Sequence, residues 1–164
     1  MLLQEAIDLV ESKSSDLLIA NESKYHREYR LQEITTFAEQ VIIYCTDRNI
    51  KSGTDFSICT FLDKNIYYRL KSDRNYIPEE KIAYSICFGL QLTFAEATYL
   101  LNKARMNMIP STPNDMYREL LVQMLITGKT YIPECNKELE ALGFQLLGSF
   151  SKNGKLVSHN IKNK

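Results

Sequence analysis

The segment from residue 52 to residue 92 constrains the fold most, because its apolar residues recur at helical spacing only in short runs. Ser52 can cap a first helix that carries Phe56 inward. The apolar period then breaks at Leu62, and Asp63 follows as a second N-cap, since its carboxylate can accept from the free amides of the next turn. The segment therefore predicts two short helices joined by a tight turn.

The second of these helices, over residues 63–71, is expected to separate an apolar stripe from a polar face. Ile66, Tyr67 and Leu70 form the inward stripe. Lysine and arginine can bind phosphate or guanine, asparagine can bind adenine, and a tyrosine ring can lie along a sugar or a thymine methyl. The side chains predicted to read bases are Lys64, Asn65, Tyr68 and Arg69. This face has the residue types that suit a DNA groove.

The segment resembles the Cro and phage-repressor type of helix-turn-helix domain. The positions that carry the resemblance are Ser57 (small residue), Leu62 (apolar turn residue), Asp63 (cap), Leu70 (end of the recognition helix) and Pro78 (before the next helix). The resemblance covers about the middle third of the chain. It implies an all-α, five-helix repressor-like domain that binds double-stranded DNA with its recognition helix in the major groove.

Two positions depart from the family pattern. Phe61 stands where the family usually has glycine in the turn, and Gly53 stands where a phosphate-binding glutamine is common. The second departure implies one missing backbone contact. The remaining phosphate contacts are expected from Ser52, Lys71, Arg74 and Lys81.

The resemblance implies that this domain runs from about residue 31 to residue 106. A long helix is expected from Leu31 to about residue 48, with Ile50 as a plug after it. Pro78 is expected in the first turn of the fourth helix and Gly89 in a left-handed cap at its end, and Thr93 with Glu96 forms a capping box for the fifth.

Additional segments flank the domain on both sides. Residues 1–30 are expected to form an N-terminal helical extension, and residues 107–150 a C-terminal helical hairpin whose helices end near Gly128 and Gly143. This hairpin also resembles a segment that follows the domain in some longer family members, through the spacing of Asn136, Leu139, Leu142 and Gly143. Residues 151–164 read as a basic, disordered tail that could touch phosphate, or equally as a tail without a function.

Composition and motifs narrow the function classes. Lys plus Arg and Asp plus Glu number 20 each, which argues against a strong non-specific polyanion binder but allows a local basic footprint. The four cysteines have no metal-ligand spacing, and they are expected as buried thiols, with no metal or cofactor.

No nucleotide-binding or catalytic motif is present, and His26 and His159 are the only histidines, so no enzyme is expected. No signal peptide or membrane span is indicated, and the expected location is cytoplasmic.

Two functional hypotheses remain. The first is a sequence-specific transcriptional regulator, repressor-like, that binds DNA as a homodimer across two half-sites. The second is an adaptor or inhibitor that uses the same scaffold to bind a protein partner. Zero net charge, Phe61, Gly53 and the two tyrosines at positions 67 and 68 favour the second.

Overall fold

The computed structural model describes residues 35–109, 112 and 115–149, and this part of the chain is all-α, with seven helices and no strand. The chain divides into two units, residues 1–35 and 36–164, and the following concerns the second. The helices are α2 (Phe37–Asp47), α3 (Gly53–Thr60), α4 (Lys64–Ser72), α5 (Glu80–Gly89), α6 (Phe94–Lys103), α7 (Met116–Thr127) and α8 (Ile132–Ala141). The predicted N-terminal extension and the basic tail lie outside the described residues.

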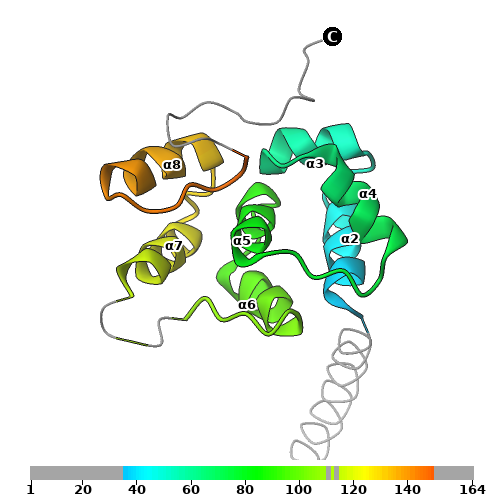
Figure 1. The fold of residues 1–164 in the computed structure, drawn as a ribbon, viewed down its shortest axis with the longest axis horizontal. Helices are drawn as coiled ribbons and strands as arrows, with labels where there is room; N and C mark the ends of the chain where they lie inside the picture. Colours follow the sequence, from blue (N-terminus) through cyan, green and yellow to red (C-terminus); the bar gives the residue numbers. More distant parts are fainter. Residues whose placement is uncertain (1–34, 110–111, 113–114, 150–164) are drawn as a thin grey trace, which may run out of the picture. The chain divides into compact units, whose positions relative to one another are not determined.

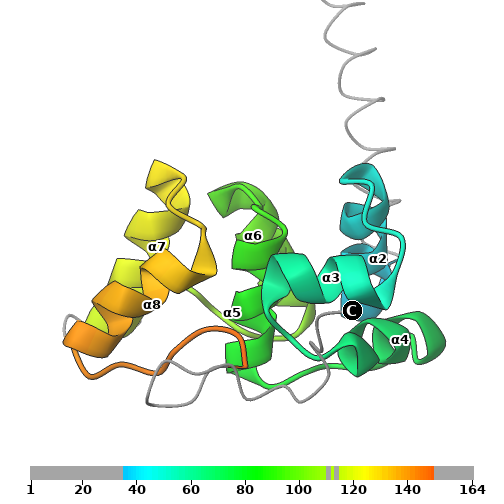
Figure 2. The ribbon, with the colours of Figure 1, turned by 90° about the horizontal axis from the view of Figure 1, so that it is seen from above.

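The central helices α5 and α6 separate two groups of helices (Figure 1). On one side α4 packs on both α2 and α3, while α3 also packs against α5 and α2 against α6. On the other side α8 packs on α5 and α7 on α6, and Figure 2 shows the same order from above. One continuous core runs through all seven helices, and among its fully buried side chains are Phe37, Phe56, Tyr84, Phe88, Leu100 and Leu101.

The start of α2 differs from the expected helix over residues 31–48. Thr36 has extended backbone (φ −76°, ψ 170°) and is the N-cap, and it forms a capping box with Glu39. The Thr36 amide donates to Glu39 Oε2 at 3.0 Å, and the Glu39 amide donates to Thr36 Oγ1 at 3.3 Å. The prediction of one helix that runs through residue 36 is therefore wrong, because the capping box of Thr36 and Glu39 begins α2 at Phe37; residues 31–34 lie outside the described part of the chain. The plug at Ile50 is confirmed, since that side chain is buried.

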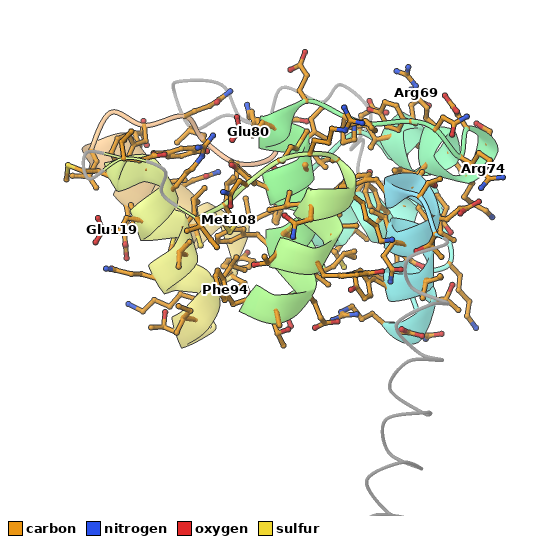
Figure 3. The ribbon with its side chains drawn as sticks, turned by 90° about the horizontal axis from the view of Figure 1, so that it is seen from below. Arg69, Arg74, Glu80, Phe94, Met108 and Glu119 are labelled. Atoms are coloured by element: carbon orange, nitrogen blue, oxygen red, sulfur yellow. The ribbon has the colours of Figure 1, made fainter. Side chains whose placement is uncertain are left out.

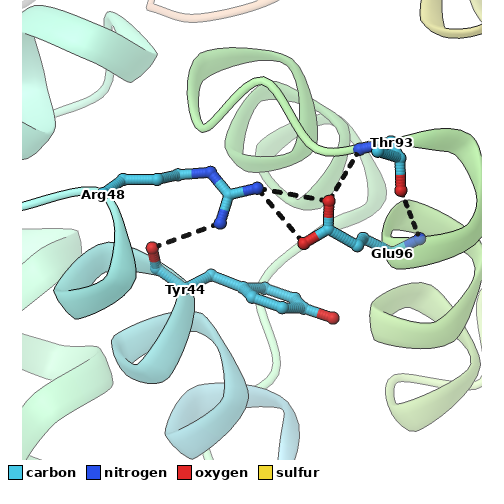
Figure 4. Close-up of polar contacts among 4 residues, drawn as sticks. All are labelled: Tyr44, Arg48, Thr93 and Glu96. Atoms are coloured by element: carbon cyan, nitrogen blue, oxygen red, sulfur yellow. Dashed lines mark hydrogen bonds and ion pairs between the residues drawn. The ribbon is translucent and has the colours of Figure 1, made fainter.

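The predicted capping box of α6 is confirmed, and it also joins α6 to α2 (Figure 4). Glu96 Oε1 accepts from the Thr93 amide at 3.1 Å, while both Glu96 carboxylate oxygens lie 3.2 Å from Arg48 Nη2. Burial acts to raise the pKa of Glu96, but the Thr93 amide and the Arg48 guanidinium together hold it below its ordinary value. The Glu96 carboxylate thus caps α6 and also binds Arg48 at the end of α2.

Two predictions about α5 are wrong. The helix begins at Glu80 with Glu79 as N-cap, so Pro78 lies before its first turn. Gly89 is the last residue of α5, and the left-handed conformation occurs two residues later, at Gln91 (φ 52°). A Cβ atom on Gly89 would lie 2.5 Å from the Thr60 Cα atom. Glycine is therefore required because α5 crosses the end of α3 at close range.

The predicted helix ends near Gly128 and Gly143 are confirmed, and both glycines are left-handed, with φ 74° and 73°. After α8 the chain returns to the core at Leu147, whose side chain is fully buried. Asn136 holds this return: its Nδ2 donates to the Leu147 carbonyl at 2.9 Å, and its Oδ1 accepts from the Leu147 amide at 2.7 Å. The asparagine in the N-x-x-L-x-x-L-G spacing therefore has a structural role in this chain.

Candidate functional site

Helix α4 is fixed in rotation by its cap and by two buried side chains. Asp63 Oδ1 accepts from the Asn65 amide at 2.8 Å, so the predicted N-cap is confirmed. Tyr67 and Leu70 are only 3% and 2% exposed, and the Tyr67 ring packs on the Phe56 ring of α3 with centroids 5.6 Å apart. Since the inward face cannot turn, the opposite face of α4 is held toward solvent.

The outer face of α4 brings together the four side chains predicted to read bases. These are Lys64, Asn65, Tyr68 and Arg69, and all four are exposed. The Arg69 guanidinium lies over the Tyr76 ring, 4.1 Å from its centroid, and Figure 3 shows Arg69 at the outer edge of the molecule near Arg74. Stacking on an aromatic face limits the rotamers of an arginine while leaving its donors available. This surface, called here the α4 face, is therefore a row of donors on a fixed support.

The start of α3 lies against the α4 face. A Cβ atom on Gly53 would lie 2.8 Å from Cε2 of the Tyr68 ring and 3.0 Å from the Lys64 Cβ atom. Glycine at this position lets the tyrosine ring cover the first turn of α3. Ser52 Oγ accepts from the Asp55 amide at 3.1 Å, which confirms the predicted cap. The amide-rich start of α3, which favours anions, therefore borders the donor row.

The turn between α3 and α4 contains a residue in the left-handed conformation that is not glycine. Phe61 has φ 56° and ψ 25°, a conformation that costs a non-glycine residue roughly 1–2 kcal/mol. Its ring meets the Tyr131 ring at the start of α8, with centroids 6.2 Å apart and planes at 71°. The conformation that glycine would adopt is thus kept, and an aromatic contact with the C-terminal hairpin is added.

The side chains predicted to contact phosphate have different surroundings. Lys71 is exposed, with Nζ 5.6 Å from the Tyr67 ring centroid. Arg74 Nε lies 3.3 Å from Glu39 Oε1 in an exposed ion pair, so a phosphate would compete with that carboxylate. Lys81 is half-buried in the first turn of α5, and the Ser52 hydroxyl is engaged in the cap.

Carboxylates moderate the positive charge of this region. Asp55 lies in the first turn of α3, and Asp63 and Asp73 cap the two ends of α4. The basic excess near the α4 face is therefore small, and the arrangement suits a few directed contacts better than a broad electrostatic surface.

Three of the four cysteines are buried thiols, as predicted. Burial raises the pKa of Cys45 and of Cys87 to about 12, and that of Cys135 to about 11, so these groups stay protonated near neutral pH. Cys59 is half-buried. Among the residues that the structure describes, no cluster of three potential metal ligands occurs, and none of the helices is long and apolar enough to span a membrane.

Comparisons with known proteins found no matching family model, no matching curated protein and no matching solved structure.

Three features of the site were not predicted from the sequence. They are the Arg69–Tyr76 stack, the packing of Tyr68 on Gly53, and a hydrogen bond from the Ser149 amide to the Phe61 carbonyl at 2.8 Å. The packing of Tyr68 on Gly53 had a signal in the sequence, because glycine stands there in place of the glutamine that is common in the resembling family. The third joins residues far apart in sequence, and no local pattern indicates it.

Proposed function

We propose that α3 and α4 form a helix-turn-helix of the Cro and phage-repressor type, and that the protein is a sequence-specific DNA-binding transcriptional regulator. The observation that carries this proposal is the α4 face: four exposed donor side chains on a helix whose opposite side is locked by Tyr67 and Leu70. A recognition helix needs this combination, because base readout depends on a rigid placement of a few polar groups.

The surroundings of α4 support the same proposal. The start of α3 borders the α4 face through the Gly53–Tyr68 contact, where its amides can meet a phosphate beside the groove. Phe61 supplies the left-handed turn residue that the resembling family provides with glycine. Lys71 and Arg74 extend the basic groups along α4 and past its end.

The proposed mechanism is steric. A homodimer would place two copies of α4 in successive major grooves, about 34 Å apart, and so occupy a pseudo-palindromic site. Lys64, Asn65, Tyr68 and Arg69 would read bases, and Ser52, Lys71, Arg74 and Lys81 would hold phosphates. Occupancy of the site would exclude the polymerase.

A second candidate function is binding of a protein partner through the same region. Ile58 on the outer side of α3 is 63% exposed, Ile77 after α4 is 51% exposed, and Tyr68 is 52% exposed. Exposed aliphatic and tyrosine side chains with little net charge are typical of protein interfaces. Salt dependence separates the two functions, because only phosphate contacts release counterions.

Selection from a pool of random duplexes at low and moderate salt tests the proposal. The parent is expected to enrich a palindromic site. Lys64→Ala and Arg69→Ala should each weaken binding to that site by about 1–3 kcal/mol, the usual contribution of a side chain that reads a base edge. Lys137→Ala, on the exposed side of α8, removes the same charge away from α4 and should bind like the parent. Folded parent that enriches nothing at either salt concentration would reject the regulator and favour the protein partner.

A further inference from the structure

A cavity lies at α7 and α8, which are separated from α4 by α5 and α6 (Figure 1). Its volume is about 130 Å³, and the residues that line it are Met124, Lys129, Tyr131, Glu134, Cys135 and Glu138. A cavity of about 150 Å³ can hold a benzene molecule, whereas drug-sized ligands need about 300 Å³ or more. This cavity therefore has room for the end of one side chain.

The buried part of the cavity wall is apolar and uncharged. Met124 and Cys135 are both buried, and Cys135 Sγ donates to the Lys129 carbonyl at 3.1 Å. Long cationic side chains pack their aliphatic stems along such surfaces and keep the charged end near water. The wall thus suits the stem of a lysine or an arginine.

The exposed part of the wall favours a guanidinium. Glu134 and Glu138 lie one helical turn apart on α8, and neither is in an ion pair within the part of the chain that the structure describes. With Lys129, two negative charges face one positive charge. The Tyr131 ring lines the same cavity and is oriented by its contact with the Phe61 ring. A guanidinium donates to carboxylates in a planar fork and stacks on aromatic rings, so this lining fits arginine better than lysine.

Exposed apolar side chains continue this surface along α8. Tyr131 is the N-cap and Leu142 the C-cap, and both are exposed. Glu134 and Glu138 lie between them at spacings of three and four residues, which places the four side chains on one side of the helix. This surface, called here the α8 strip, is about 16 Å long at 1.5 Å per residue. A free cation would fill only the cavity, whereas a peptide segment with arginine between apolar residues would cover the whole strip.

We propose that the α8 strip docks a segment of a partner protein that inserts an arginine side chain into the cavity. The guanidinium lies between the two carboxylates and against the Tyr131 ring, and the aliphatic stem follows the buried wall. Charge complementarity favours a basic segment, because the exposed charged residues from 116 to 142 are four glutamates and two lysines. This inference does not depend on what α4 binds.

The test uses the full chain and a blocked seven-residue peptide with a central arginine and a leucine at each end. A matched peptide carries citrulline, which has nearly the shape of arginine without its charge, and acetylated arginine amide represents the free cation. Binding is followed through the chemical shifts of the backbone amides of α7 and α8, and each Kd is obtained by titration.

Two double variants separate the cavity from general negative charge. Glu134→Gln with Glu138→Gln removes both carboxylates of the cavity. Glu119→Gln with Glu140→Gln removes the same charge from exposed positions on α7 and α8 that do not line it. Thermal unfolding checks that each variant is folded, and the citrulline comparison needs only the parent.

The arginine peptide is expected to shift the amides of the α8 strip and to bind the parent at least about tenfold more tightly than the citrulline peptide, since hydrogen bonds between charged groups are the stronger ones. The cavity variant should lose about the same factor. The control variant should bind like the parent.

Each other outcome would overturn the proposal. Equal Kd values for the arginine and citrulline peptides, or equal losses in the two double variants, would reject the cavity as a site for a cationic side chain. Acetylated arginine amide that binds as tightly as the peptide would indicate a site for a free cation and reject the docking strip. A parent dimer that only the cavity variant dissociates in sedimentation would place a second copy on the strip instead of a partner. No shift of these amides at millimolar peptide would reject the site outright.

Discussion

Gly89→Ala tests the close crossing of α5 and α3 that positions α4. A Cβ atom at this position would lie 2.5 Å from Thr60 Cα, and 2.7 Å from both the Cys59 carbonyl oxygen and Thr60 Cγ2. Favourable contacts between carbon atoms begin at about 3.5 Å, so the two helices must separate by close to 1 Å. Two of the three atoms belong to backbone, and no side-chain rotation can relieve them.

The expected magnitude follows from two opposing effects. Overpacking a well-filled contact costs about 1–3 kcal/mol. Replacing glycine by alanine in a helix interior stabilises it by up to about 1 kcal/mol, and less at the last residue of α5. We expect a net loss of about 1–2 kcal/mol, which lowers Tm by roughly 4 °C per kcal/mol for a domain of this size.

Urea and thermal unfolding followed by circular dichroism measure this loss. Thr60→Ser removes Cγ2 but keeps the hydroxyl that donates to the Phe56 carbonyl at 2.7 Å, so the double variant with Gly89→Ala should recover only a small part of it. Gly128→Ala serves as the reference, because its φ of 74° is strained but no atom lies within 4 Å of the added Cβ. A Gly89→Ala protein as stable as the parent, or more stable, would refute the close crossing.

Three further predictions concern the cap, the ion pair and the thiols. Asp63→Ala should cost about 1 kcal/mol in urea unfolding, whereas Asp63→Asn should keep the cap and most of the stability. The hydrogen bond from Tyr84 and then the pairing with Arg118 hold the pKa of Glu80 below its ordinary value, so this stabilisation is present above the ordinary carboxyl pKa and is lost as pH falls through the folded pKa. Since the Glu80 side chain is 46% exposed, Glu80→Gln should lower the free energy of unfolding by under about 1 kcal/mol at neutral pH. The difference in unfolding free energy between the parent and this variant should disappear in acid, and a difference that is independent of pH would contradict the prediction. Native protein should react with a thiol reagent first at Cys59, with Cys59→Ser as control, and faster labelling of fully buried Cys87 would contradict the core packing.

The features that could be predicted from the sequence are those with local causes. Ser52, Asp63 and the Thr93–Glu96 pair were identified as caps because each acts within three residues of the amide that it accepts from. The buried stripe of α4 was predicted for a similar reason, since helical periodicity is a short-range pattern. These local signals suffice to give the order of the described helices and the polar face of α4.

The wrong predictions concern residues whose role depends on a contact with a residue far away in sequence. Gly89 was interpreted as a helix cap because glycine near a helix end usually has that role, but here Thr60 of α3 decides its identity. The role of Gly53 depends in the same way on Tyr68. The hydrogen bond between Ser149 and Phe61 joins residues 88 positions apart, so it could not be predicted from either segment alone.

The contacts around Phe61 also explain how the C-terminal helices are joined to the turn between α3 and α4. A left-handed phenylalanine persists only where its surroundings hold it, since the conformation itself is unfavourable. Two of the groups that hold it come from the C-terminal side of the chain: the Tyr131 ring, 6.2 Å away between centroids, and the Ser149 amide on its carbonyl. A glycine in this turn would not need such support, because glycine adopts the left-handed conformation readily. In this chain, we infer, the hairpin and the segment after it take part in setting the angle between α3 and α4, and through it the position of the α4 face.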